Sequence, residues 1–169
     1  MTTVAWDGKT LAADKRATIG GTRTTITKLR RGKGGNLVGV SGTASLMEAI
    51  FAWLCDGGKK PEAQEDRSDW CGVIEIDPDG RCFKHERWGK FQIEAPYFAV
   101  GSGSDLALAA MSLGCDAAKA VEVASQFDTA SGDGVDALHL AAAKPAKAPR
   151  RATVGPRLAA AAPRKGAKR

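Results

Sequence analysis

The chain has 169 residues, four cysteines and a formal net charge of +6. Residues 141–169 hold nine Lys and Arg and no acid, and subtracting them leaves residues 1–140 mildly acidic at −3. No apolar run approaches the ~18 residues of a membrane span, and charges begin at Asp7, which argues against a signal peptide. We therefore expect one folded domain over 1–140, followed by a disordered, basic Ala/Pro/Lys/Arg tail over 141–169.

The cysteines argue against two common types of site. Cys55, Cys71, Cys82 and Cys115 are separated by 16, 11 and 33 positions. This spacing matches neither a zinc site nor a thioredoxin-type pair, so buried free thiols are the expectation. A reduced, cytoplasmic location follows.

The chain is expected to open with a β-hairpin, made of residues 2–6 and 10–14 with a turn at Asp7-Gly8. An Asp-Gly pair supplies the positive φ angle that a tight type I′ turn needs. The outer ends of two such strands lie close together. This geometry alone brings Asp14 near Thr2.

Two further strands are expected at 24–29 and 36–41, after a loop at Gly20-Gly21. In the second of these strands, Gly39 shares a face with Leu37. A glycine on that face either lets the backbone approach a ligand closely or serves tight packing. The pattern leaves both explanations open.

Helical periodicity then begins at Ser45, whose spacing to Glu48 is that of a capping box, and a polar loop is expected at 59–68. The elements expected after the loop are a hairpin of 70–77 with 81–88, a strand over 91–100, helices over 105–113 and 116–127, and a closing strand over 135–140. This order fits two antiparallel sheets covered by helices, and does not fit a parallel doubly wound fold.

The second residue is a candidate nucleophile. Initiator methionine is normally removed when the next residue is as small as threonine, so the mature chain is expected to begin with Thr2. Its free amine, with a reference pKa of roughly 7.7–8.0, can act as the base that a hydroxyl needs. The two histidines, His85 and His139, make a Ser-His-Asp or Cys-His site hard to assemble. Taken alone, however, Thr2-Thr3-Val4 is more often the start of an edge strand.

Four separated stretches occur together in one order: Thr2-Thr3-Val4, Ala12-Ala13-Asp14-Lys15-Arg16-Ala17-Thr18, Gly101-Ser102-Gly103-Ser104 and Asp128-Thr129-Ala130-Ser131-Gly132. With them, residues 2–140 resemble the proteasome β-subunit and the HslV-type bacterial peptidase, which are N-terminal-nucleophile hydrolases. Each stretch alone is weak, but the combination is specific.

The resemblance implies a role for each matching residue. Thr2 matches the nucleophile, Asp14 its acidic partner and Lys28 the essential lysine. The glycine whose N–H serves the oxyanion hole is matched by Gly39. The residues that orient the terminal amine are matched by Ser102, Asp128 and Ser131. A charged Lys28 beside Thr2 would favour ionisation of the hydroxyl, with Asp14 holding the lysine in place.

The resemblance also implies an α+β fold, a four-layer αββα sandwich, and hydrolysis of peptide bonds within a homo-oligomeric ring that acts on peptides or unfolded proteins. It implies no cofactor and no metal. The chain departs from the family in its short segment between Asp14 and Lys28, in having only 59–68 where relatives have a second long helix, and in ending its foldable part at Leu140. Ring size, ring stacking and an ATPase partner therefore stay open.

Two other functions are compatible with the sequence. The same machinery serves amidases that act on small substrates. Alternatively, the fold is an inactive interaction protein whose basic tail binds nucleic acid or another polyanion, with an affinity that falls as salt rises. Ala17, Ile26 and Leu37 are expected to line an apolar pocket beside Thr2, but the sequence does not identify the substrate.

Overall fold

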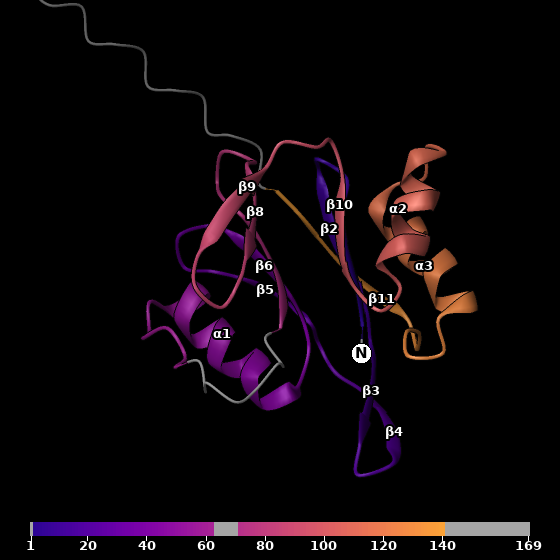
Figure 1. The fold of residues 1–169 in the computed structure, drawn as a ribbon, viewed down its shortest axis with the longest axis horizontal. Coiled ribbons are helices and arrows are strands. Elements are labelled where there is room, and N and C mark those ends of the chain that lie inside the picture. Colours follow the sequence, from indigo (N-terminus) through magenta and orange to yellow (C-terminus); the bar gives the residue numbers. More distant parts are fainter. Residues whose placement is uncertain (1, 63–70, 141–169) are drawn as a thin grey trace, which may run out of the picture.

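The structure, a computed structural model, describes residues 2–62 and 71–140, so the expected tail and most of the expected loop at 59–68 lie outside the described residues. In the described residues, two antiparallel sheets lie face to face and helices cover the outer face of each (Figure 1). The expected αββα sandwich of the α+β class is confirmed.

The first sheet has the strand order β10-β1-β2-β11, with all neighbours antiparallel. Its strands are β1 (Thr3–Trp6), β2 (Thr10–Asp14), β10 (Phe98–Gly101) and β11 (Val135–His139). One face is covered by α2 (Ser104–Ser112) and α3 (Ala117–Phe127) (Figure 1). Asp116 caps α3, because its side chain accepts a hydrogen bond from the Lys119 amide at 2.7 Å.

The second sheet has the strand order β5-β6-β7-β8-β9. Its strands are β5 (Leu29–Arg31), β6 (Leu37–Ser41), β7 (Gly72–Ile76), β8 (Cys82–His85) and β9 (Lys90–Ile93). Its outer face carries α1 (Ala44–Asp56). Val38 and Val40 of β6 pack under this helix, whereas Leu37 points inward between the sheets, as the alternation of the strand predicts.

The two sheets enclose the main hydrophobic core. Val4, Leu11, Leu37, Ile74 and Ile76 are fully buried there and come from both sheets. Burying side chains of this size contributes roughly 1.5–3 kcal/mol each. The core therefore fixes the sheets against each other and holds the ends of β1 and β2, which carry the candidate site.

A separate two-stranded hairpin, β3 (Arg16–Ile19) and β4 (Thr22–Thr25), projects from one end of the sandwich (Figure 1). The sequence predicted a loop at Gly20-Gly21, and these glycines form the turn of the hairpin, both with positive φ. The strand predicted at 24–29 is wrong in its bounds, because the chain leaves the hairpin after Thr25 and enters the second sheet at Leu29.

Two other local predictions are wrong. The strand predicted over 91–100 is two strands, β9 and β10, in different sheets. Pro96 lies between them, and proline cannot donate to a strand ladder. The capping box at Ser45 is also absent, because the N-cap is Thr43, two residues earlier, and its side chain makes no capping hydrogen bond.

All four cysteines are free thiols, three of them buried and Cys115 half-buried. Burial raises the pKa of Cys71 to about 11 and that of Cys82 to about 12. Within residues 2–62 and 71–140, no group of three or more His, Cys, Asp or Glu side chains is placed to hold a metal. In the same ranges, none of the helices is long and apolar enough to cross a lipid bilayer.

Candidate active site

A buried ion pair lies at the end of the first sheet. Asp14 ends β2, and Lys28 lies just before β5. The Lys28 Nζ is 3.0 Å and 3.1 Å from the two carboxylate oxygens of Asp14, and it also donates to the Arg16 carbonyl at 2.6 Å. Both side chains are about 1 % exposed. Burial lowers the pKa of Lys28 from its ordinary value, although Asp14 opposes this by favouring the charged lysine.

Backbone amides hold the Asp14 carboxylate from three directions. The Thr3 amide donates to Oδ1 at 2.9 Å, while the Arg16 and Gly132 amides donate to Oδ2 at 3.0 Å and 2.9 Å. A carboxylate that accepts several N–H bonds is fixed in orientation. Asp14 therefore presents its carboxylate to Lys28 in a fixed position.

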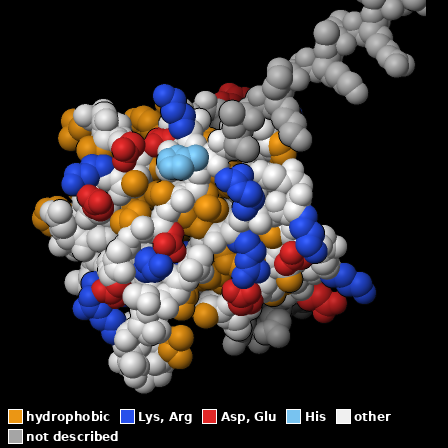
Figure 2. All heavy atoms as spheres, turned by 180° about the vertical axis from the view of Figure 1, so that it is seen from behind, with side chains coloured by type: hydrophobic (Ala, Val, Ile, Leu, Met, Phe, Trp, Pro, Cys, Tyr) orange, Lys and Arg blue, Asp and Glu red, His pale blue; other side chains and the backbone are white. Residues whose placement is uncertain are grey.

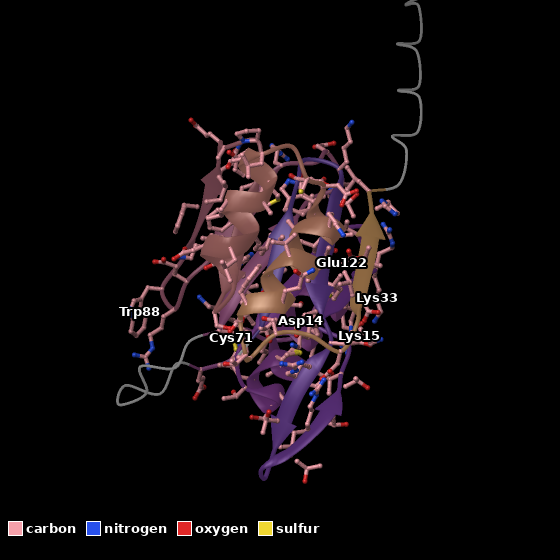
Figure 3. The ribbon with its side chains drawn as sticks, turned by 90° about the vertical axis from the view of Figure 1, so that its right-hand side faces the viewer. Asp14, Lys15, Lys33, Cys71, Trp88 and Glu122 are labelled. Atoms are coloured by element: carbon pink, nitrogen blue, oxygen red, sulfur yellow. The ribbon has the colours of Figure 1, made fainter. Side chains whose placement is uncertain are left out.

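Thr2 lies at the wall of a cavity of about 740 Å³ that Lys28 also lines. Thr2 is almost fully buried, and no hydrogen bond among the described residues uses its hydroxyl. The expected proximity of Thr2 to Asp14 is reached through Thr3, whose amide contacts the carboxylate. Figure 3 shows Asp14 at the end of the sandwich from which the β3–β4 hairpin projects.

Gly101 supports the backbone of residue 2 from the neighbouring strand. It lies opposite Thr3 in the β1–β10 ladder, with a φ of +101°. A Cβ at this position would overlap the carbonyl oxygen of Thr2. Only glycine leaves room for the main chain here, so the start of β1 is set closely against β10.

A network of hydroxyls and one carboxylate surrounds the start of β1. Ser102 and Ser131 each donate to Oδ2 of Asp128 at 2.6 Å, and the hydroxyls of Ser131 and Thr3 are 2.7 Å apart. Burial acts to raise the pKa of Asp128, but the hydrogen bonds from Ser102 and Ser131 outweigh it and lower the pKa from its ordinary value. The predicted set of Ser102, Asp128 and Ser131 is thus brought together in the fold.

The structure places Gly39 away from the cavity. Gly39 is in the middle of β6, and a Cβ there would lie 2.5 Å from the Val4 side chain and 3.1 Å from that of Leu29. A side chain at this position would face the core, so tight packing explains the glycine, and the structure does not bring Gly39 to the cavity that Thr2 lines. Gly42 lines the cavity instead, just before α1.

Some residues that contact the predicted site residues were not predicted from the sequence. Arg16 supplies the carbonyl that fixes Lys28, and Gly132 supplies an amide to Asp14. Both lie inside the recognised stretches, which is the signal that could have identified them. Of the apolar residues expected in the pocket, Ala17 and Ile26 line the cavity, whereas Leu37 lies in the core.

Comparisons with known proteins give matches among solved structures. No protein-family model matches the chain, and no curated protein matches it. Thiobacillus denitrificans BPH is similar with a TM-score of 0.62 and 21% identity, covering 82% of this chain and 98% of that chain. The same protein in complex with epoxomicin gives a TM-score of 0.65 and 21% identity, covering 84% and 100%.

Eukaryotic HslV from Trypanosoma brucei is similar with a TM-score of 0.59 and 22% identity, covering 81% of this chain and 97% of that chain. These alignments extend over nearly the whole length of each neighbour. The TM-scores, all above 0.5, show a common fold, whereas identities of 21% and 22% do not establish a common activity. The chain therefore has the HslV and proteasome β-subunit fold, as the resemblance of its four short stretches implied.

Proposed function

We propose that the chain is a threonine-type peptidase, an N-terminal-nucleophile hydrolase that cleaves peptide bonds through Thr2 after removal of Met1 frees its amine. The observation that carries the proposal is that Thr2 and Lys28 line one cavity while buried Asp14 fixes the lysine at 3.0 Å. This arrangement supports the proposal because the buried lysine lines the same cavity as the Thr2 hydroxyl, which makes no hydrogen bond among the described residues.

In the proposed reaction the Thr2 hydroxyl oxygen bonds to the substrate carbonyl carbon, and its proton passes to the Thr2 amine. The amine then returns this proton to the leaving nitrogen as the C–N bond breaks, which leaves an ester on Thr2. A water molecule gives a proton to the amine and attacks the ester, releasing the acid and restoring the hydroxyl. The positive charge of Lys28 favours the ionised hydroxyl in both steps.

The negative charge that develops on the substrate oxygen needs a donor. We assign this role to the Gly42 amide in place of Gly39, because Gly42 lines the cavity two residues before α1. The N-terminal end of a helix carries a partial positive charge, which favours an oxyanion nearby. One such donor is typically worth ~3–4 kcal/mol of transition-state stabilisation. We propose that Ser102, Asp128 and Ser131 orient the amine, since Ser131 already contacts Thr3.

The test is covalent labelling by epoxomicin, the compound present in the structure of the Thiobacillus protein. Intact mass of the purified protein should show loss of Met1 and one added inhibitor. Thr2→Ala should retain the thermal midpoint and show no adduct, whereas Thr22→Ala, an exposed threonine outside the cavity, should label like the wild type. A wild-type protein that keeps Met1 and still cleaves peptides at the full rate would refute the mechanism.

The other functions predict different outcomes. An amidase for small substrates would take up the inhibitor and cleave small amides, but would leave peptides uncut. An inactive interaction protein would do neither, and its binding would depend on the basic residues at 141–169. On the face shown in Figure 2, basic and acidic side chains are interspersed, so that face offers no continuous basic surface to a polyanion.

We further propose a homo-oligomeric ring in the reducing cytoplasm that the free thiols suit. Large apolar side chains on the surface support subunit contacts: Leu113 and Phe127 are 87 % and 69 % exposed. Native mass spectrometry tests the assembly. A chain that stays monomeric at micromolar concentration would contradict it.

A further inference from the structure

The β3–β4 hairpin forms one wall of the cavity and stands apart from both sheets. Neither of its strands pairs with a strand of the sandwich. All four residues of β4 are exposed, so the hairpin buries little against the body. Ala17, Thr18 and Ile19 nevertheless line the cavity that contains Thr2. The position of the hairpin therefore sets the width of the cavity.

One side chain ties the outer part of the hairpin to the body. Arg23 of β4 donates from Nε to Oδ2 of Asp133 at 2.8 Å, and its Nη2 contacts Oδ1 of the same carboxylate. Among the described residues, this is the polar contact by which residues 17–25 reach beyond the hairpin itself. With few apolar contacts, such a segment depends on its tether to stay ordered.

Asp133 holds a second arginine as well. The Arg16 Nε donates to Oδ2 of Asp133 at 3.1 Å, and its Nη1 donates to the Thr129 carbonyl at 2.7 Å. The Arg16 guanidinium occupies the space that a side chain at Gly132 would need. The hydrogen bonds from Arg23 and then Arg16 lower the pKa of Asp133 from its ordinary value, so the carboxylate stays charged between two cations.

This cluster connects directly to the candidate active site. The carbonyl of Arg16 accepts the hydrogen bond from Lys28 at 2.6 Å. The amide of Gly132, next to Asp133, donates to Asp14 at 2.9 Å. Asp133 therefore contacts Arg23 of the hairpin, and also Arg16, which lines the cavity and whose carbonyl accepts the hydrogen bond from Lys28.

We propose that Asp133 is a positioning residue with two separable tasks: through Arg23 it holds the hairpin wall and so sets the affinity for an extended peptide, and through Arg16 it holds the carbonyl that orients Lys28. The inference rests on the proposed function, because it concerns the same site. Asp133 has a left-handed φ of +63°, which asparagine also tolerates. Asp133→Asn therefore removes the charge without straining the backbone.

The kinetic test compares Arg23→Ala, Arg23→Lys and Asp133→Asn, with Arg81→Ala as the matched control. Arg81 pairs with Asp77 and Asp79 in a turn that contributes nothing to the cavity wall. Arg23→Ala should raise KM for an extended peptide by about 3- to 10-fold with kcat within twofold, and Arg23→Lys should recover part of the loss. Asp133→Asn should also lower kcat by about 10-fold, and it should slow the reaction of Thr2 with a small β-lactone that does not reach the hairpin.

Hydrogen exchange supplies a readout that does not depend on activity. Arg23→Ala and Asp133→Asn should speed exchange of the amides of residues 16–25, whereas Arg81→Ala should not. Unchanged exchange and unchanged KM in Arg23→Ala would overturn the tether, and identical kinetics for Arg23→Ala and Asp133→Asn would overturn the second task. A wild type that neither cleaves peptides nor reacts with the β-lactone would refute the proposed function, and the exchange data would still decide whether Asp133 holds the hairpin.

Discussion

Removing Asp14 and removing Lys28 should have different effects on stability, because each removal leaves different groups buried without their partners. Asp14→Ala leaves the ammonium of Lys28 buried with only the Arg16 carbonyl, and it removes the Asp14 acceptor of the Thr3 and Gly132 amides. The Arg16 amide still donates to the Gly132 carbonyl at 2.9 Å. Removing one partner of a buried ion pair costs about 3–5 kcal/mol. Lys28→Met leaves a carboxylate that still accepts three amide hydrogen bonds, so we expect a smaller cost of about 1–3 kcal/mol.

The assay is urea unfolding of Asp14→Ala, Lys28→Met and the double variant, monitored by intrinsic fluorescence. The double variant should be about 1–3 kcal/mol more stable than the sum of the single losses predicts, because Lys28→Met removes the buried charge that Asp14→Ala leaves without an ion-pair partner. Lys28→Met should abolish peptide cleavage while it remains folded at 25 °C. Equal losses for the two single variants, or strict additivity, would refute the reasoning.

Three further results follow from the structure. Since burial lowers the pKa of Lys28 from 10.5, kcat/KM should fall with rising pH before an ordinary lysine deprotonates, and an alkaline limb at or above 10.5 would contradict this. The hydrogen bond from His85 lowers the pKa of Glu75 from 4.5 to about 2. The stabilisation that the ionised Glu75 gives the protein is therefore present above pH 4.5 and is lost as pH falls towards 2. Glu75→Gln should flatten the decline of the thermal midpoint in that pH range, and an unchanged decline would argue against the Glu75–His85 pair. Gly39→Ala should destabilise the protein by about 1–3 kcal/mol and leave kcat of the folded protein intact, whereas Gly42→Ala should lower kcat. The reverse pattern would restore Gly39 to the oxyanion site.

Local patterns predicted those parts of the fold and site that depend on neighbours in sequence. The Asp7-Gly8 turn forces β1 and β2 together, and this alone brought Asp14 to the start of β1. Gly39 could not be assigned in the same way. Whether a glycine faces a ligand or a packed side chain depends on how two sheets meet, and no residue within β6 carries that information.

The remaining errors have similar causes. The stretch 91–100 is apolar enough for one strand, yet its two halves pair with β8 and β1 in different sheets. The two arginines that hold Asp133 are 117 and 110 positions away from it along the chain. Ion pairs between such distant residues leave no periodic signal, so only the folded chain reveals them.

The close fit at Gly101 has a consequence for the chemistry of residue 2. Because Gly101 has no side chain, the carbonyl of residue 2 fits against it, and the fold positions residue 2 through its main chain. The position of its Cβ therefore does not depend on which atom is bonded to that carbon in the side chain. Serine or cysteine at this position would direct an oxygen or a sulfur into the cavity that Lys28 also lines. In the proposed reaction, the fold would then specify where the bond forms and leave the attacking element exchangeable. A single codon change can convert the hydroxyl into a thiol, and the same position is open to selenium introduced by synthesis.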